Sequence, residues 1–326
     1  MDFFGAVIIV VGLVVFETIA SIDNAIINAD ILSTMKERAR KWFLTWGLII
    51  AVFVIRGILP WIIIWVSTPE LGPIGALTAT FSGDARAATA IEMSAPYLLV
   101  AGGIFLLFLF LHWLLAEEKN CIVPGERFLT KMEPWFNAVA AVVSLAFIII
   151  SMNVNPVLAI AVAIGSVVYF IMMGIRIFAD KKSLELEKAG DSQPETNSKK
   201  LAHSDVSKLV LLEVIDASFS VDGVIGAFAF TLSVPLILIG NGIGAFVVRE
   251  LTVRNIDNIR KFAYLKNGAM YSIGCLGVIM CLEAFRVEIP IWFPPVLTIV
   301  IVGVFFVLSL IKIKKNDYGV CKLRND

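Results

Sequence analysis

A short polar stretch inside the first hydrophobic segment decides how this chain must fold. It reads FETIASIDNAIINAD over residues 16–30 and places Glu17 and Asp23 in an otherwise apolar surrounding. A shift of 199 positions lays Glu17 on Asp216 and Asp23 on Asp222, so an acid, five residues and a second acid occur twice. Each carboxylate at the centre of a bilayer costs about 2.5–3.5 kcal/mol. The fold must therefore provide contacts that offset the cost of burying the carboxylates in both copies of the motif.

The composition is that of a membrane protein. Of the 326 residues, 59% are hydrophobic and 17% are charged, against roughly 25% charged residues in soluble domains. The formal net charge is zero, so the sequence predicts no binding to nucleic acid. The chain has two histidines and contains no HExxH motif, no Gly-rich phosphate loop and no Ser/His/Asp set. We therefore predict that it is not an enzyme.

Apolar runs of spanning length predict an all-α polytopic membrane protein with about nine transmembrane helices. A helix needs roughly 20 predominantly apolar residues to cross a bilayer. The candidate spans cover residues 4–32, 42–66, 95–115, 135–151, 157–178, 208–233, 236–252, 264–284 and 293–312. The segment Ser67 to Ser94, between the second and third spans, fits either a surface amphipathic helix or a re-entrant piece.

Lysine and arginine residues concentrate in every second loop, and the intervening loops contain Arg86 and Arg286 alone. Cytoplasmic loops are enriched in basic residues, so nine spans place the N-terminus outside and the C-terminus in the cytoplasm. The polar segment 179–207 lacks Phe, Tyr and Trp, and we expect a disordered cytoplasmic linker there. It separates a first membrane bundle, residues 1–178, from a second, residues 208–326.

The two motif copies then cross the membrane in opposite directions, which is typical of transporters built from inverted repeats with a midplane binding site. A straight helix over residues 3–32 would be about 45 Å long, against a hydrocarbon core of about 30 Å. We therefore expect a break near Ser21, where an unwound turn would let Glu17 and Asp23 point at one site. Gly223 and Gly226 predict a similar break in the second copy.

The motif residues offer the ligands of a hard cation. Carboxylate and amide oxygens suit Mn²⁺, Mg²⁺ or Ca²⁺ better than Zn²⁺ or Cu⁺. The predicted metal ligands are Glu17, Asp23, Asn24, Asp216 and Asp222. Residues with predicted pathway or gating roles are Asn28, Arg56, Glu213, Ser220 and Arg249.

Arg56 in the second predicted span and Arg249 in the seventh can neutralise part of this charge. In one interpretation, these arginines pair with the acids as structural ion pairs. In the other, the four acids outnumber the two guanidinium groups, and the remaining negative charge forms a site that suits a cation. Glu213, one turn before Asp216, either couples proton entry to cation exit or lies at the cytoplasmic interface.

Both motifs resemble a known family. Glu17 with SIDNA at residues 21–25, and ExxDxxFSVD at residues 213–222, are similar to the two signature motifs of the TerC tellurium-resistance family, and more closely to those of its bacterial sibling family of integral membrane proteins. The resemblance extends to four further places in the chain: Arg56, Gly102-Gly103, Arg249 and residues 264–269. Gly223 departs from it, since TerC proteins usually have Ser there.

The resemblance implies a multi-pass protein of the bacterial inner membrane, related to the lysine-exporter-like superfamily, with Mn²⁺ efflux as its function and the motif acids as its metal site. The first hypothesis is accordingly a divalent cation exporter that works by alternating access, with Mn²⁺ favoured and Ca²⁺ or Mg²⁺ as alternatives. The second is a non-transporting membrane protein that assists membrane-protein assembly or metal and tellurite stress complexes. In the second case the buried acids and arginines are structural ion pairs.

Overall fold

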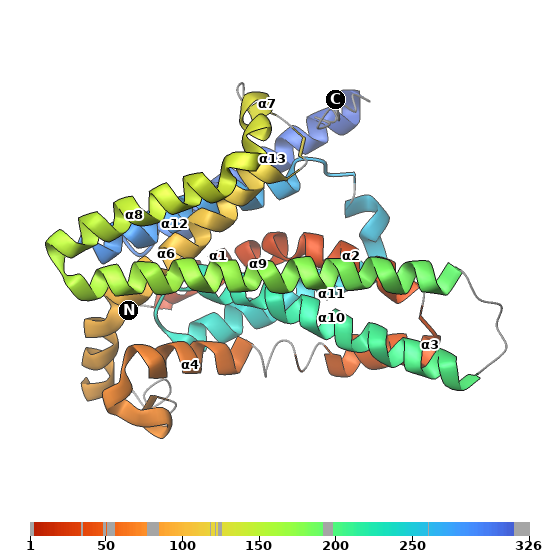
Figure 1. Cartoon of the computed structure of the whole chain (residues 1–326), viewed down its shortest axis with the longest axis horizontal. Helices are drawn as coiled ribbons and strands as arrows, with labels where there is room; N and C mark the ends of the chain where they lie inside the picture. Colours follow the sequence, from red (N-terminus) through yellow and green to blue (C-terminus); the bar gives the residue numbers. More distant parts are fainter. Residues whose placement is uncertain are drawn as a thin grey trace.

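A computed structural model describes most of the chain, namely residues 3–33, 35–47, 50, 56–76, 85–117, 119–120, 122, 126–191, 198–259 and 261–315. Inside these ranges, the side chains of Asp23 and Arg249 are among those that lie outside the description. Across the described residues the fold is all-helical, as Figure 1 shows. The all-α part of the predicted fold class is therefore confirmed.

The helices follow one another along the chain with short connections. The first part contains α1 (Phe3–Ala20), α2 (Ile22–Ser33), α3 (Glu37–Trp42), the π-helix η1 (Phe43–Gly47), α4 (Arg56–Ser67), the 3₁₀ helix η3 (Pro69–Leu71) and α6 (Ala85–Ala116). The middle part contains α7 (Glu126–Leu129), the 3₁₀ helix η4 (Thr130–Trp135), α8 (Phe136–Val154) and α9 (Pro156–Asp191). The last part contains α10 (Ser198–Ala227), α11 (Val234–Ile259), α12 (Leu265–Ala284) and α13 (Phe293–Lys315).

Six described helices are long and apolar enough to cross a membrane. They are Phe3–Ala20, Ile91–Ala116, Met132–Val154, Pro156–Ala179, Leu265–Ala284 and Phe293–Lys314. Each coincides with one of the nine predicted spans. A seventh span results if Arg56–Val66 and Pro69–Ala76, which are bent by 102°, count as one. Nine spans, the inverted repeat and the orientation of the termini thus stay predictions.

The predicted spans at residues 208–233 and 236–252 correspond to α10 and α11. Three acids within one span length, Glu213, Asp216 and Asp222, interrupt the apolar character of α10. The apolar part of α11 covers just Val234–Val248. The composition of α10 is therefore less typical of a membrane span. The acids that make it so are the site residues.

The expectation of a disordered linker over residues 179–207 was wrong for its described parts. Helix α9 continues to Asp191 and α10 begins at Ser198, while residues 192–197 lie outside the description. The segment is rich in Lys, Glu, Leu and Ala, which are strong helix formers. With 36 residues, α9 is about 54 Å long and projects well beyond a bilayer core of about 30 Å.

The outer segment Ser67 to Ser94 divides into three parts. The helical turns over Pro69–Ala76 follow α4 at a sharp bend, and residues 85–94 form the start of α6. Residues 77–84 lie outside the description, so the choice between a surface helix and a re-entrant piece stays open.

The helices pack in two groups around α6. Helix α6 lies against α12 and α9, and α8 forms a hairpin with α9. Helix α1 packs against α11 and α13, while α10 lies against α9 and contacts α1, α2 and α4. In Figure 1, α9 and α10 extend together toward the same end of the molecule. Large buried side chains of α6 and α12, such as Phe105, Trp113 and Leu276, belong to one hydrophobic core.

Small residues allow the close approach of α6, α9 and α12. A Cβ atom on Gly103 would lie 2.6 Å from Sγ of Cys281 and 2.9 Å from the carbonyl oxygen of Gly277. A Cβ atom on Gly165 of α9 would collide with the carbonyl group of Ala101. Helices in a membrane associate through this kind of close packing, since lipid provides little hydrophobic driving force between them.

Candidate functional site

The first motif lies where α1 ends and α2 begins. Ser21 forms the single residue between the two helices, at the predicted position of the break. The helical hydrogen bonds nevertheless continue across it, because Ser21 N donates to Glu17 O at 3.1 Å and Ala25 N donates to Ser21 O at 2.9 Å. The prediction of an unwound turn was therefore wrong. The two helices are separated at Ser21, while these two carbonyl groups stay hydrogen-bonded.

In the second motif, Gly223 lies inside an uninterrupted α10 that ends at Ala227, one residue after Gly226. The predicted break at Gly223 was also wrong. Gly223 has a packing role instead, because a Cβ atom there would lie 2.5 Å from Oε2 of Glu17. Gly244 of α11 has the same role on the other side of this acid, with its Cβ position 2.6 Å from Cβ of Glu17.

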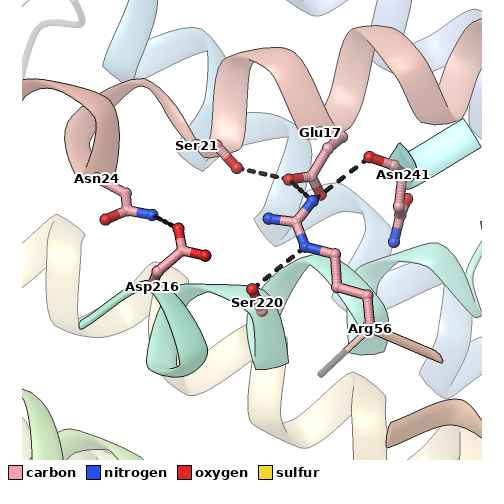
Figure 2. A network of polar contacts seen from close by, with 7 residues as sticks. All are labelled: Glu17, Ser21, Asn24, Arg56, Asp216, Ser220 and Asn241. Atoms are coloured by element: carbon pink, nitrogen blue, oxygen red, sulfur yellow. Dashed lines mark hydrogen bonds and ion pairs between the residues drawn. The ribbon is translucent and has the colours of Figure 1, made fainter. Parts of the chain in front are cut away.

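Glu17 forms a fully buried ion pair with Arg56 of α4 (Figure 2). Their side chains are 1% and 4% exposed. The hydroxyl group of Ser21 donates a hydrogen bond of 2.6 Å to Oε1 of the same carboxylate. Arg56 also donates from Nε to Oγ of Ser220 at 3.2 Å, which connects α1, α4 and α10. The first acid is thus neutralised by the protein.

Asp216 points from α10 toward α2, where Asn24 Nδ2 donates to Oδ1 at 2.5 Å (Figure 2). An amide carries no charge, so this contact orients the carboxylate without neutralising it. Oδ1 of Asn24 is buried and has no hydrogen-bond partner within the described part of the chain. One turn further along α2, Oδ1 of Asn28 is in the same condition.

Glu213 lies one turn before Asp216 on α10. Both of its carboxylate oxygens are buried, and no described residue forms a hydrogen bond with either. A Cβ atom added to Gly47 of η1 would lie 2.5 Å from Oε1, so Glu213 extends into the protein between α10 and η1. We call Asn24, Asn28, Glu213 and Asp216 the α2–α10 oxygen layer.

Asp222 faces the other side of α10, where it pairs with Arg176 of α9. The two side chains are 10% and 16% exposed, and the guanidinium group also lies 4.6 Å from the ring centre of Phe219. The sequence analysis had not selected Arg176. The available signal was the same as for Arg56, a single arginine within a predicted apolar span.

A second missed residue is Asn241 of α11, whose backbone carbonyl oxygen accepts a long hydrogen bond of 3.4 Å from Arg56. Its side chain is 1% exposed, and neither polar atom of the amide has a partner among the described residues. An asparagine in an otherwise apolar span was the signal that could have found it.

The predicted metal ligands do not gather into one cluster in this conformation. Among the described residues, no group of three or more His, Cys, Asp or Glu side chains is arranged to hold a metal ion. Glu17 and Asn24 are brought to the α10 surface that carries Asp216, whereas Asp222 turns toward α9. The side chains of Asp23 and Arg249 lie outside the description. Among the described acids, Glu17 and Asp216 thus approach the same side of α10 and Asp222 does not, and a single site that includes Asp23 stays a prediction.

A family model described as "Protein of unknown function (DUF475)" matches residues 22–316. Among curated proteins, the chain is similar to the "Uncharacterized membrane protein YceF" of Bacillus subtilis (strain 168), with 32% identity over 103 residues. That alignment covers 32% of this chain and 39% of the relative. No solved structure matches the chain. Neither match names the tellurium-resistance family, so that resemblance stays a prediction.

Proposed function

The chain belongs to the DUF475 family of proteins of unknown function, and we propose that it is a membrane transporter for a divalent cation. The proposed activity is export by alternating access, with Mn²⁺ as the favoured substrate, and it includes no chemical reaction. The multi-pass helical fold and the similarity to a membrane protein support the membrane part of this proposal. The α2–α10 oxygen layer is the observation that carries the transport part.

This layer combines free oxygen ligands with uncompensated charge. Within the described part of the chain, the buried atoms without a partner are Oδ1 of Asn24, Oδ1 of Asn28 and both carboxylate oxygens of Glu213. Asp216 adds a carboxylate that is held by an amide. Oxygen atoms of this kind are the ligands that Mn²⁺, Mg²⁺ and Ca²⁺ prefer.

The charges on the two sides of α10 explain why a cation belongs on one of them. Glu17 and Asp222 have Arg56 and Arg176 as partners. Asp216 and Glu213 form no ion pair with a described residue. Each uncompensated acid in a membrane interior costs about 2.5–3.5 kcal/mol, so the ionised layer is stabilised by a bound divalent cation.

The packing of the motif helices supports the inverted relationship of the two halves. Under the shift of 199 positions, Glu17 corresponds to Asp216 and Asn24 corresponds to Gly223. Glu17 lies beside Gly223, and Asp216 lies beside Asn24, so the two contacts are reciprocal. Reciprocal contacts are what a two-fold relation between two motif helices produces, and inverted repeats bind substrates at such a junction.

In this proposal the layer binds the cation, while Arg56 and Ser220 join α1, α4 and α10 and gate the path. Alternating access requires these contacts to be exchanged when one half moves against the other. Glu213 takes up a proton as the cation leaves. Asp23 and Arg249 keep their predicted roles as ligand and gating residue.

The test is cation flux in proteoliposomes, measured for Mn²⁺, Ca²⁺, Mg²⁺ and Zn²⁺ with and without a pH gradient. The wild-type protein should transport Mn²⁺ and discriminate against Zn²⁺. Asp216→Asn should abolish flux, whereas Glu37→Gln should not, since Glu37 is 78% exposed and pairs with Lys41 at the surface. Equal flux through wild-type and Asp216→Asn protein would refute the proposal.

The observed ion pairs favour a second candidate function. If Glu17–Arg56 and Asp222–Arg176 are purely structural, the chain is a non-transporting membrane protein that assists assembly or stress complexes. The exchange Asp222→Arg with Arg176→Asp keeps the pair and reverses its direction. Full complementation of a deletion strain by this exchanged protein, together with absence of flux in vesicles, would select the second function over the first.

A further inference from the structure

An apolar groove of about 560 Å³ opens between α4, α6, α9 and α10. Its floor consists of buried side chains, including Phe105, Ile225, Phe228 and Met280. Its rim consists of exposed aliphatic side chains on α4 and α9, among them Ile62, Val157, Ile160 and Ile164. The groove is separate from the α2–α10 oxygen layer, none of whose residues lines it.

The surroundings of this groove identify its occupant. The lining parts of α6, α9 and α12 belong to three of the six membrane spans. Exposed aliphatic side chains on such spans face hydrocarbon, since their exposure to water would be unfavourable. A groove that opens toward hydrocarbon and has an apolar floor excludes water and polar solutes. We propose that it binds one acyl chain of a membrane phospholipid.

The dimensions of the groove agree with this occupant. Along α6 the lining runs from Tyr97 to Phe105, and along α9 it runs from Val157 to Val168. Eight and eleven helical residues correspond to about 12 and 16 Å at 1.5 Å per residue. One leaflet of a hydrocarbon core about 30 Å thick has a depth of about 15 Å. The groove is therefore as deep as one leaflet.

One end of the groove carries the polar groups that a phospholipid needs. The hydroxyl group of Tyr97 accepts a hydrogen bond of 3.2 Å from Nδ2 of Asn155, the residue between α8 and α9. Tyrosine is enriched at the membrane interface, where its ring contacts chains and its hydroxyl group contacts headgroups. The lipid headgroup thus lies at the Tyr97 end, and the chain extends toward Phe105 and Val168.

The bound chain would contact the motif helix directly. Val221 and Ile225 of α10 line the groove, and Asp222 lies next to Val221 in the sequence. The acyl chain would consequently contact α10 on the side opposite to Glu17 and Arg56. This binding does not depend on cation transport and can be tested without it.

The experiment uses phospholipid with a photoactivatable diazirine at the end of an acyl chain, incorporated into vesicles of phosphatidylethanolamine and phosphatidylglycerol that contain the full-length protein. Adducts are mapped by mass spectrometry of proteolytic fragments. Adducts should concentrate on the floor residues Phe105 and Ile225. Adducts confined to the rim and to the outer face of α8 would overturn the proposal.

Filling the groove provides the second arm. Ala161→Phe adds a ring at the floor and should reduce floor adducts at least tenfold, while adducts at the exposed Val142 and Leu145 of α8 stay constant. Val168→Phe is the second filling variant if Ala161→Phe does not fold, and Val142→Phe is the matched control on α8. Unchanged floor adducts in a folded filling variant would also overturn the proposal.

Discussion

The interface between α6 and α12 and the junction between α2 and α10 join helices in opposite ways. At the first, Gly103 and Gly277 allow the backbones to touch, and aromatic and aliphatic side chains fill the remaining space. At the second, Asn24 and Asp216 meet through a single polar contact, and buried oxygen atoms are left without partners. The first arrangement maximises contact, whereas the second keeps ligand atoms available.

The difference shows which part of this protein contains groups that lower the stability of the fold. Unpartnered buried polar atoms cost about 1–3 kcal/mol each, so a fold selected for stability alone would remove them. Among the described residues they occur next to Asp216, at Asn24, Asn28 and Glu213. Glu17 and Asp222 are each held by an arginine through one carboxylate oxygen, and their other oxygen is buried without a described partner. Four substitutions test the pairing of these acids and the close packing of the helices, in order of decreasing effect on stability.

The largest effect should come from Glu17→Ala, because it leaves the guanidinium group of Arg56 buried without a counter-ion. Breaking a buried ion pair by removing one partner costs about 3–5 kcal/mol. The loss should appear in the free energy of unfolding, measured by denaturant titration in detergent micelles. Glu37→Ala is the control and should leave this free energy unchanged, since the Glu37–Lys41 pair is exposed. Equal stabilities of the two variants would contradict the assignment.

Arg176→Gln should have the next largest effect. It removes a charged hydrogen bond to Asp222, and such bonds contribute about 1.5–3 kcal/mol. The effect should be smaller than for Glu17→Ala because this pair is 10% and 16% exposed. A double-mutant cycle with Asp222→Asn measures the coupling. Additive losses in the two single variants would show that the residues do not interact.

Gly165→Ala tests the close packing of α6 and α9. The added methyl group meets the carbonyl group of Ala101, and overpacking of this kind costs about 1–3 kcal/mol. Gly174→Ala is the matched control on the same helix, where nothing lies within 4 Å of the added atom. It should stabilise the protein by about 0.5–1 kcal/mol, because alanine is the better helix former. Changes of the same sign in both variants would contradict the interface.

Asp216→Asn should have the smallest effect on stability, within about 1 kcal/mol, because the carboxylate has an amide partner and no ion pair among the described residues. Its effect on transport should nevertheless be complete. Asp222→Asn is the control with the same chemistry, and it should destabilise the fold because the ion pair with Arg176 is lost. A strongly unstable Asp216→Asn protein would mean that this acid is structural after all.

The sequence by itself determined the membrane class, six of the spans, the separation of two helices at Ser21 and the acids of the candidate site. These features follow from composition and from local spacing, which carry their signal within a single helix. Even Gly223 was visible, as a departure from the motif that the resemblance to the tellurium-resistance family predicts. Its reason, the approach of Glu17 to within 2.5 Å of a Cβ position, required the neighbouring helix.

The tertiary structure alone decided which acid is paired and which is free. Arg56 and Arg176 give the same signal in the sequence, a lone cation in an apolar run, yet one contacts Glu17 and the other Asp222. Asp216, one of the same set of acids, receives only an amide. These partners are set by the rotation and register of α1, α4, α9 and α10 against one another. Rotation and register arise from packing between helices, and the periodicity of any single helix does not encode them.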